Sequence, residues 1–548
     1  MVFKSPFPDV DVPSVDIPTF LFEYARKHTV YGKNPNLPIL IDETATLTFA
    51  DLEEISTSFA SGLVNNAEFQ RGDILAIVLP NTSYYPVIAL GTQMVGGTVT
   101  TANPAYTARE LAHQLKLTQA KYVVTLQTTV PTVKEALRIA GMTVPDKRIF
   151  TIDGTNSILD ILSSKPFTRI RLTTREQAAN TPSFIVFSSG TSGQPKGVVL
   201  SHRNIVSNVL QSIEFDKADK IIKAADKNIA HQAWMCVLPM FHIYGMTVIM
   251  LLSIAKGAHL IILRSFNLEK FVSLSEKHKA SVAHLSPPVI LRLAKDPVVS
   301  KYDLSSFVYV NSGSAPLSKE LQLEAEARIR ADITQGYGLS ETSPTTHRSL
   351  MATKVFGSIG SLFSSMECKI LDDGGNELGV NQVGEICLRG PNIMMGYLKN
   401  PQATAEAIDE DEFLHTGDIG YVDENGHYYV TDRKKELIKY KGFQVAPAEL
   451  EGLLTDHPAV IDSAVIPVYD ESRASEIPKA FVVIRPEMDT PGIAEEVRVW
   501  LDSRVIQYKR LRGGVEVIGA IPKSVSGKIL RRVLKEREAK KRKLKANL

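Results

Sequence analysis

Short apolar runs rich in β-branched residues alternate with stretches of helical pattern along much of the chain. Three such runs are ILAIVLP (74–80), YVVTL (122–126) and SFIVFSS (183–189), and the segment 107–120 between the first two carries leucines at helical spacing. Runs that are apolar throughout indicate strands buried on both faces, and intervening helices join such strands in parallel. The sequence therefore predicts an α/β fold with stacked, largely parallel sheets.

The patterns further along divide the chain into a large body and a small C-terminal domain. The length of 548 residues corresponds to about three or four folding units. Glycines and short alternating strands over 354–430 predict a more antiparallel, β-barrel-like subdomain, and after the charged run DRKKE a new α+β pattern begins with a helix that starts at Pro447. We expect an N-terminal body at 1–431, a hinge at 432–435 and a small mobile α+β domain at 436–548.

The composition argues against several classes of protein. The formal net charge is +2, so no global charge favours nucleic acid or anionic lipid. The three cysteines, Cys236, Cys368 and Cys387, lack metal-ligand spacing, which argues against a zinc site or a disulfide framework. The first residues lack the apolar core of a signal peptide, and the most apolar run, 248–254, is far shorter than a membrane-spanning helix. We expect an intracellular protein without nucleic-acid binding or membrane insertion.

The stretch FSSGTSGQPKGVVLSH at 187–202 predicts a loop that binds a polyphosphate. It differs from a Walker A loop because Pro195 precedes the lysine and Gly197 follows it, so no neighbouring hydroxyl is available for Mg²⁺. Glycines let backbone N–H groups approach oxyanions closely, hydroxyl groups add donors, and a lysine adds a charge. The alternative is a flexible Gly/Ser loop, which so dense an arrangement disfavours.

Further motifs follow this loop in a fixed order. They are NSGSAPLSKEL (311–321), QGYGLSETSP (335–344), HTGDIGYVDENGHYYVTDR (415–433), DRKKELIKYKGFQVAPAELE (432–451) and PKSVSGKILRR (522–532). From about Thr48 to Arg532 the chain resembles the adenylate-forming superfamily, which contains acyl-CoA ligases, firefly luciferases and peptide-synthetase adenylation domains. FHIYG at 241–245 is more similar to the 4-coumarate–CoA ligase branch than to firefly luciferase.

The resemblance assigns the nucleotide-binding residues. Tyr337 would stack on adenine, Ser340 would approach the α-phosphate, and Glu341 would hold Mg²⁺, roles that suit a flat ring and a hard oxygen ligand. Asp418 would accept hydrogen bonds from the ribose hydroxyls, and Arg433 would contact ribose or phosphate. Taken alone, Tyr337 and Asp418 would each be interpreted as turn residues. The other residues expected to bind ATP are Ser188, Ser189, Gly190, Thr191, Ser192, Gly193, Lys196, Gly313, Ala315, Pro316, Gln335, Gly336 and Gly338.

Two steps of chemistry follow from the resemblance. A carboxylate attacks the α-phosphate of ATP, and a preorganised cation there, here Lys528, stabilises the accumulating negative charge. A thiol, that of coenzyme A, then takes the acyl group after the C-terminal domain has rotated about the hinge at Lys435. The expected catalytic residues are Lys528, His242, Glu341 and Ser340, and those expected to bind CoA are Lys439, Lys441, Gly442 and Phe443. The alternative for each lysine is a solvated surface residue.

The acyl pocket is expected around LPMFHIYGMTVIM, where His242 corresponds to the family's gate histidine, although a lone histidine beside Phe241 is more often part of a core. Plant 4-coumarate ligases carry a lysine at the position of Asn311, so this departure weakens the case for a hydroxycinnamate substrate. An aryl or phenylpropanoid acid and a medium-chain fatty acid both stay open. The residues expected to line the pocket are His242, Tyr244, Thr247, Ser286, Asn311, Gly313 and Gly338.

We expect a Mg²⁺·ATP-dependent carboxylate–CoA ligase that works through an acyl-AMP intermediate. One alternative is a luciferase-type monooxygenase that adenylates its acid and then oxidises it. Another is a stand-alone enzyme that loads a carrier protein, which the lack of a Gly-x-Asp-Ser carrier domain disfavours. A degenerate binding protein is disfavoured because Lys196, Glu341, Asp418 and Lys528 are all present.

The C-terminal residues predict peroxisomal import. Ala546-Asn547-Leu548 keeps the small residue and the leucine of a Ser-Lys-Leu signal but lacks its basic residue. The sequence KANL also resembles the ending of animal catalase, a peroxisomal protein. We expect recognition by the peroxisomal import receptor, with a solvated helix end in a cytoplasmic protein as the alternative.

Overall fold

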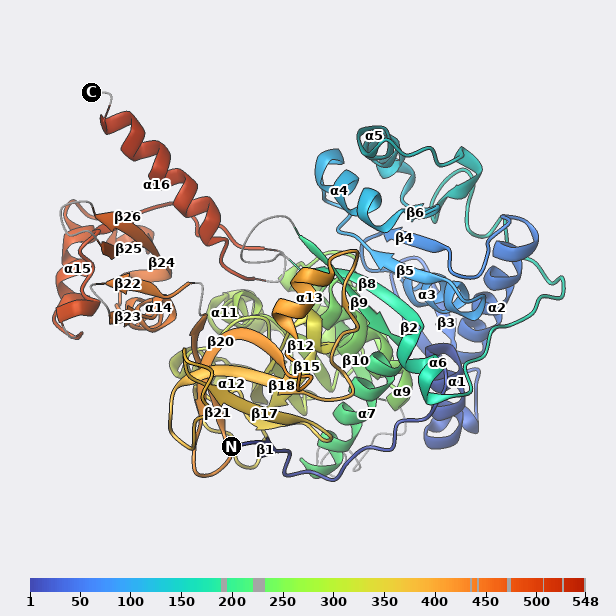
Figure 1. Cartoon of the computed structure of the whole chain (residues 1–548), viewed down its shortest axis with the longest axis horizontal. Coiled ribbons are helices and arrows are strands. Elements are labelled where there is room, and N and C mark those ends of the chain that lie inside the picture. Colours follow the sequence, from blue (N-terminus) through green and yellow to red (C-terminus); the bar gives the residue numbers. More distant parts are fainter. Residues whose placement is uncertain are drawn as a thin grey trace. The chain divides into compact units, whose positions relative to one another are not determined.

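The computed structural model describes residues 1–188, 195–219, 232–433, 436–440, 443–470, 475–505, 507–524 and 527–546, with only the backbone at 432, 433, 439, 443, 444 and 542–546. The chain forms two compact units (Figure 1). The larger unit comprises 2–368 and 388–415, and the smaller unit comprises Met1, 369–387 and 416–548. The boundary expected at 432–435 stays a prediction, and 434–435 lie outside the described residues.

A seven-stranded sheet forms the first layer of the larger unit. Strands β8, β5, β4, β6 and β7 are parallel to one another, β9 pairs antiparallel with β8, and β19 pairs antiparallel with β9. In spatial order the strands are β19 (Gly396–Tyr397), β9 (Lys196–Ser201), β8 (Pro182–Ser188), β5 (Thr98–Thr101), β4 (Ile74–Val78), β6 (Tyr122–Thr125) and β7 (Ile149–Thr151).

The strand β4 shows why the apolar runs of this sheet are continuous. Leu75 and Ile77 belong to the main hydrophobic core, whereas Ala76 and Val78 belong to a second core packed against α4 (Ala108–Thr118) and α5 (Val130–Ala140). Because successive side chains of a strand point to opposite faces, a strand covered on both faces has no polar positions. The predicted strands at 74–80, 122–126 and 183–189 are β4, β6 and β8.

A nine-stranded sheet forms the second layer. It is parallel from β2 through β14 and antiparallel at both ends. In spatial order the strands are β16 (Ser361–Leu362), β15 (Thr345–Arg348), β14 (Asp332–Gly338), β13 (Tyr309–Ser312), β12 (Val282–Leu285), β10 (Ala233–Cys236), β11 (His259–Ile262), β2 (Pro38–Ile41) and β3 (Thr46–Thr48).

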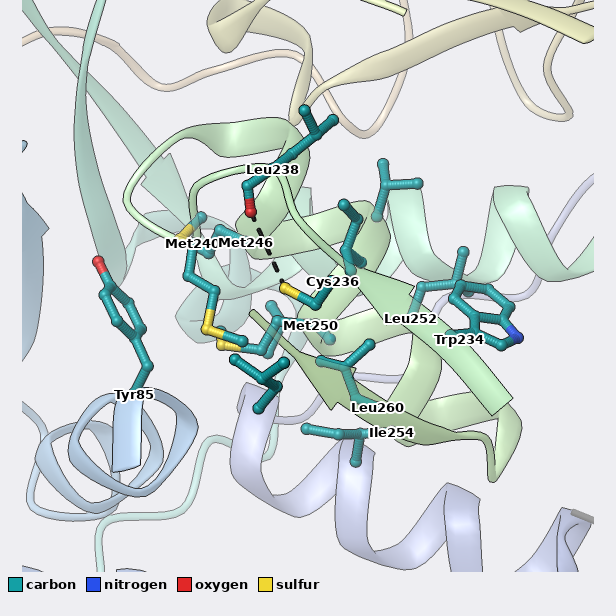
Figure 2. Close-up of a cluster of buried hydrophobic side chains, with 14 of the residues drawn as sticks. Tyr85, Trp234, Cys236, Leu238, Met240, Met246, Met250, Leu252, Ile254 and Leu260 are labelled. Carbon is teal, nitrogen blue, oxygen red and sulfur yellow. Dashed lines mark hydrogen bonds between the residues drawn. The ribbon is translucent and has the colours of Figure 1, made fainter. Parts of the chain in front are cut away.

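The main hydrophobic core joins these two layers. Figure 2 shows Met240, Met246 and Met250 beside Cys236, with Tyr85 of α3 (Tyr84–Met94) facing the methionines from the seven-stranded layer. All of these side chains are buried. Methionine fills irregular gaps well, which suits a core between two sheets.

Helices cover the sheets and connect their strands (Figure 1). The remaining helices of the larger unit are α1 (Ile17–His28), α2 (Phe49–Asn65), α6 (Arg175–Asn180), α7 (His202–Ala218), the π-helix η4 (Tyr244–Leu251), α9 (Leu252–Lys256), α10 (Leu268–Lys277), α11 (Pro287–Lys295), α12 (Lys319–Ile329) and α13 (Pro401–Ala407). Its 3₁₀ turns are η1 (Val30–Gly32), η2 (Gln127–Thr129), η3 (Asp146–Arg148), η5 (Pro297–Lys301) and η6 (Ser340–Thr342).

A buried ion cluster braces the larger unit between its helices and the nine-stranded sheet. The Asp216 carboxylate of α7 pairs with Lys256 of α9 and with Arg348 of β15, and the Asp216 side chain is 0% exposed. The Arg348 guanidinium also lies over the Phe215 ring, 4.3 Å from its centroid. Charges this deeply buried are tolerated only when they are paired, so the cluster depends on all three members.

A five-stranded sheet lies in the region predicted to be β-barrel-like. Its order is β1 (Phe3–Lys4), β17 (Glu367–Leu371), β18 (Gly384–Arg389), β20 (Leu414–Val422) and β21 (Tyr428–Arg433). The division into units passes through β17, β18 and β20. Within the smaller unit, β20 pairs antiparallel with β21.

The C-terminal part of the smaller unit has its own hydrophobic core, as its α+β pattern predicted. Strand β24 pairs antiparallel with β25, and β25 pairs parallel with β26. The elements are β22 (Ile438–Tyr440), β23 (Phe443–Val445), α14 (Pro447–Thr455), β24 (Val460–Asp470), β25 (Ser475–Ile484), η8 (Pro486–Met488), α15 (Ile493–Asp502), η9 (Gln507–Lys509), β26 (Val515–Val517) and α16 (Arg531–Ala546).

The predicted α/β class is confirmed, including a large N-terminal body followed by a smaller C-terminal domain. Proline at the first turn of α14 confirms the predicted helix start at Pro447. Within the part of the chain that the structure describes, every helix is too short or too polar to span a bilayer.

Candidate active site

The parallel strands β12, β13 and β14 bring several predicted site residues to one edge of the nine-stranded sheet. Leu285, Ser312 and Gln335 are partners across these three strands. The residues that follow, Ser286 and Gly313, therefore leave the sheet at the same edge. The carboxyl ends of parallel strands are the usual place for a ligand in an open α/β sheet.

The Asn311 side chain belongs to a buried hydrogen-bond network. Its amide nitrogen Nδ2 donates to the Tyr244 hydroxyl at 2.7 Å, and its Oδ1 accepts from the Thr334 hydroxyl at 3.0 Å. The Tyr244 hydroxyl also lies 3.2 Å from His284 Nδ1. Burial lowers the pKa of His284 to about 3 and raises that of Tyr244, so both rings are neutral near pH 7. The network contains no charged group.

Two glycines of the expected pocket permit close packing. A Cβ atom at Gly313 would lie 2.9 Å from the Tyr244 ring, and one at Gly338 would lie 2.0 Å from the carbonyl oxygen of Pro344. Any side chain at Gly338 would therefore displace backbone, whereas one at Gly313 would push the Tyr244 ring. These glycines are required by the protein's own packing.

The loop that carries His242 is held from the seven-stranded layer. Asn81, the third residue after β4, donates from Nδ2 to the carbonyl oxygens of Leu238 and Leu263 at 3.0 and 3.2 Å, and its Oδ1 accepts from the Met240 N–H at 2.7 Å. The Thr101 hydroxyl donates to the next carbonyl oxygen, that of Phe241, at 2.7 Å. The backbone immediately before His242 is thus fixed by two polar side chains of the other sheet.

His242 and Thr247 lie on either side of the start of the π-helix η4. His242 is half-buried, and its Nδ1 accepts from the Tyr244 N–H at 3.3 Å. Thr247 lies within η4, and its buried hydroxyl forms no hydrogen bond with any described residue. A wide π-helical turn is often found at functional sites.

The expected adenine side is organised by Gln335. Its Oε1 accepts from the Leu317 N–H at 3.0 Å, which fixes the end of the segment that contains Ala315 and Pro316. Tyr337 follows on β14, with its ring centroid 5.7 Å from that of His347. Gln335 therefore acts within the protein, as a support for the segment after β13.

Glu341 lies in the turn η6 and contacts a residue that the motifs did not single out. The Tyr397 hydroxyl donates to Glu341 Oε1 at 3.0 Å. The Tyr397 ring also faces Lys196, whose Nζ is 4.6 Å from the ring centroid. Burial, and after it the Glu341 charge, raises the pKa of Tyr397, so its hydroxyl keeps its proton at neutral pH. Glu341 and Lys196, predicted for metal and phosphate, are thus neighbours of one tyrosine.

The predicted phosphate loop joins β8 to β9. Ser188 and Lys196 face each other as the last pair of this antiparallel hairpin, which brings both ends of the loop together. Ser189, Gly190, Thr191, Ser192 and Gly193 lie outside the described residues.

In the smaller unit, two predicted residues have a described local structure. Asp418 is buried on β20, where its N–H donates to the Thr416 hydroxyl at 3.0 Å, and its partner on β21 is Arg433. The Lys528 carbonyl oxygen accepts from the Ser524 N–H at 2.8 Å. Only the backbone of Arg433, Lys439 and Phe443 is described, and Lys435, Lys441, Gly442, Asn547 and Leu548 lie outside the described residues.

The sequence patterns did not reveal Asn81, Thr101 or Tyr397. Asn81 is the second residue after the apolar run 74–79, so a polar residue beyond the carboxyl end of a parallel strand was an available signal. Thr101 is the last residue of β5 and gave the same kind of signal. Tyr397 is exceptional because its role depends on a contact with Glu341 that the local sequence does not encode.

Two family models match the chain. The model of the AMP-binding enzyme matches residues 28–398, and that of the AMP-binding enzyme C-terminal domain matches 449–528. The curated 4-coumarate–CoA ligase 3 of Arabidopsis thaliana is 39% identical over 552 residues, which cover 97% of this chain and 93% of the relative. The chain belongs to the AMP-binding enzyme family. 4-Coumarate–CoA ligase 1 of Petroselinum crispum is 38% identical, over 98% of this chain and 97% of its own length.

Solved structures of AMP-binding enzymes have the same fold. ATP-bound MatB from Rhodopseudomonas palustris superposes with a TM-score of 0.83 at 26% identity, covering 94% of this chain and 98% of that one. An anthranilate CoA ligase, AuaEII, in complex with anthranoyl-AMP superposes with a TM-score of 0.82 at 22% identity, over 96% and 98% of the two chains.

Membership of this family confirms the predicted enzyme class. This AMP-binding enzyme is an AMP-forming acid–thiol ligase, and the predicted route, ATP-dependent ligation of an acid to CoA through an acyl-adenylate, is that of its relatives. ATP and CoA are its co-substrates, and its third substrate is a small carboxylic acid.

Proposed function

We propose that this enzyme ligates to CoA an acid whose tail carries no charge, either an aryl or phenylpropanoid acid or a medium-chain fatty acid. The observation that carries the proposal is the neutral network of Tyr244, Asn311, Thr334 and His284. Both ends of the Asn311 amide are occupied inside the protein, where plant 4-coumarate ligases have a lysine. The residues expected to line the pocket include no aspartate, glutamate, lysine or arginine.

The first half-reaction uses groups from both units. A carboxylate oxygen of the acid attacks the α-phosphorus of ATP, a P–O bond forms to the acid, and pyrophosphate leaves. Lys528 places a cation where the negative charge accumulates. Tyr337 supports adenine, Asp418 accepts from the ribose, Ser340 approaches the α-phosphate, and the residues at 188–196 hold the outer phosphates.

A Mg²⁺ ion fits the nucleotide side of this site. Glu341 offers a carboxylate of which Oε1 is oriented by Tyr397, and Mg²⁺ commonly takes one or two carboxylates together with phosphate oxygens and water. When bound, Mg²⁺ neutralises charge on the phosphates. Glu341 is the residue that would hold it.

The second half-reaction needs the thiol of CoA at the acyl carbonyl. The thiol sulfur attacks the carbonyl carbon, the thiol proton is released, and AMP leaves. A hinge at Lys435 within 432–435 would let the domain at 436–548 withdraw Lys528 and present Lys439, Lys441, Gly442 and Phe443 instead. His242, expected on the acid side of the site, would face the incoming thiol.

Matched pairs of acids test the pocket. We expect octanoate to exceed octanedioate, and cinnamate to exceed 4-carboxycinnamate, by at least about 100-fold in kcat/KM, because an unpaired buried carboxylate costs several kcal/mol. Thioester formation would be followed with saturating ATP, Mg²⁺ and CoA. Equal turnover within each pair would contradict an uncharged pocket.

For localisation, we infer import into peroxisomes through Ala546-Asn547-Leu548. The proposal is supported by the small residue and the leucine of the tripeptide. A fluorescent protein fused ahead of the last 12 or so residues should become punctate, and deletion of the tripeptide should abolish this. A diffuse signal that deletion leaves unchanged would rule the proposal out.

A further inference from the structure

We propose that Tyr397 is a positioning residue that couples the expected metal ligand Glu341 to the phosphate-side Lys196. The inference rests on the proposed function, because it takes the roles of those two residues from there. Tyr397 itself belongs to none of the sequence motifs that predicted the site. Its side chain contacts both residues, through different groups.

The two contacts differ in kind. The Tyr397 hydroxyl donates to Glu341 Oε1 at 3.0 Å, and the face of its ring lies 4.6 Å from Lys196 Nζ. A hydrogen bond to one carboxylate oxygen fixes the rotation of the carboxylate, as partners of metal-ligating carboxylates generally do. A ring face attracts an ammonium group and limits the positions that its flexible stem can reach. One side chain thus restrains two charged groups.

The Tyr397 backbone is itself tied to both regions. Tyr397 pairs with Val198 of β9, and the Leu398 N–H donates to the Gly197 carbonyl oxygen at 2.7 Å. On the other side, the Met394 N–H donates to the Glu341 carbonyl oxygen at 2.9 Å. The segment therefore links the return strand of the phosphate loop to the turn that carries Glu341.

Side chains lock this linking segment in place. The Tyr397 N–H donates to the Thr404 hydroxyl at 2.9 Å. Asn204 at the start of α7 donates to the carbonyl oxygens of Pro391 and Ile393 at 2.9 and 2.7 Å, and Asn392 donates to that of Thr342 at 2.7 Å. With so many backbone groups fixed, removal of the Tyr397 hydroxyl should change the restraint on Glu341 without moving the chain.

Two substitutions at this position separate the two contacts. Tyr397→Phe removes the hydroxyl and keeps the ring, whereas Tyr397→Leu removes both. Tyr302→Phe is the matched control, because the Tyr302 hydroxyl also donates to a glutamate, that of Glu269, at 3.5 Å. Tyr302 directly follows η5 and lies outside the motifs. ATP binding would be measured by calorimetry without acid, once with Mg²⁺ and once with EDTA, and the Mg²⁺ dependence of AMP formation would be measured separately.

We expect Tyr397→Phe to weaken ATP binding in Mg²⁺ by about 10-fold or more and to leave binding in EDTA unchanged, because the hydroxyl acts through the metal ligand. Tyr397→Leu should also weaken binding in EDTA, through Lys196. Tyr302→Phe should match the wild type in both media. Equal behaviour of Tyr397→Phe and Tyr302→Phe would overturn the proposal.

A double-mutant cycle makes the test independent of folding losses. In a Glu341→Gln background, Tyr397→Phe should have little further effect on Mg²⁺-dependent binding, because the two residues act as one unit. Additive effects would contradict the coupling. If the wild type binds ATP but releases no AMP with any acid, the proposed function fails while the binding comparison still decides the role of Tyr397.

Discussion

Asn311 in the larger unit and Lys528 in the smaller unit are held in different ways. In the larger unit, Asn311 and Tyr244 are locked in a buried network, and Asp216 ties α7 to α9 and β15 from a fully buried position. In the smaller unit, the Lys528 carbonyl oxygen accepts from the Ser524 N–H, and the ion network around Glu516 reaches half-exposed Arg537 and Lys541. The residues expected to line the acyl pocket are thus part of a buried network, whereas the Lys528 backbone is bound to a residue close to it in the sequence.

This difference predicts which property each substitution changes. A change in the buried networks of the larger unit should lower its stability or alter ligand affinity. A change at Lys528 should alter one rate and leave stability unaffected.

Asp216→Asn should lower the free energy of unfolding of the larger unit by about 3–5 kcal/mol, because it leaves Arg348 and Lys256 buried with one neutral partner. Urea unfolding would be followed by the fluorescence of Trp234 in a Trp500→Phe background. The control is Asp332→Asn, whose pair with Lys354 is half-exposed and should be worth less than about 1 kcal/mol. Similar losses of unfolding free energy in both variants would show that burial of the ion pair does not determine the destabilisation.

Lys528→Ala should slow acyl-adenylate formation by about 100-fold or more, which corresponds to roughly 2.7 kcal/mol, because one preorganised cation is lost from the transition state. Its melting temperature and its affinity for ATP should stay close to those of the wild type. Pyrophosphate release gives the rate, and Lys535→Ala, an exposed lysine on α16, is the control. Near-normal adenylation by Lys528→Ala would remove the catalytic assignment.

Glu516→Gln should destabilise the smaller unit by about 1–2 kcal/mol at neutral pH. Burial alone would raise the pKa of Glu516, but hydrogen bonds from Lys541 and Lys479 outweigh it and lower this pKa to about 2. The stabilisation is therefore complete above the ordinary pKa of 4.5 and is lost as the pH falls toward 2.

Acid unfolding of the wild type and of Glu516→Gln, followed by Trp500 fluorescence in a Trp234→Phe background, would test this prediction. Their stabilities should converge as the pH falls from 4.5 to 2. Glu536→Gln, which removes an exposed pair with Arg532, should change stability by less than about 0.5 kcal/mol. A constant difference between wild type and Glu516→Gln at all pH values would exclude the pKa shift as the cause.

Asn311→Ala should have the smallest effect, a several-fold change in KM for the acid with KM for ATP unchanged. It removes the donor to the Tyr244 hydroxyl and the acceptor of the Thr334 hydroxyl, and a net hydrogen bond between neutral groups is worth only about 1 kcal/mol. The control, Asn65→Ala, removes a surface amide that donates to the Ser61 carbonyl oxygen. An equal change in both KM values for Asn311→Ala would indicate general disruption.

Local patterns predicted the frame of the molecule well. Local patterns predicted the strands β4, β6 and β8 and the start of the helix at Pro447. This was possible because an apolar run or a proline position is a pattern within a few consecutive residues. Contacts between distant segments could not be predicted from such local patterns. Asn81 and Leu238 are 157 positions apart, and Tyr397 and Glu341 are 56 positions apart, so their roles depend on the packed structure.

The predicted site shows the same limit in finer detail. The motifs named Asn311 and Gln335, but they did not reveal that both amides bind within the protein, Asn311 to Tyr244 and Thr334, and Gln335 to the Leu317 backbone. Side-chain chemistry is visible in a sequence. The hydrogen-bond partner of a side chain depends on where the sheet places the residue.

The most direct test of the account is AMP release from ATP with a panel of cinnamates, benzoates, phenylacetates and fatty acids, each with and without CoA. The account predicts that one class of uncharged-tail acids gives CoA-dependent AMP and an equal amount of thioester. Acyl-AMP that forms but does not respond to CoA would contradict it, and the roles assigned to the smaller unit in the second half-reaction would be the first to fall.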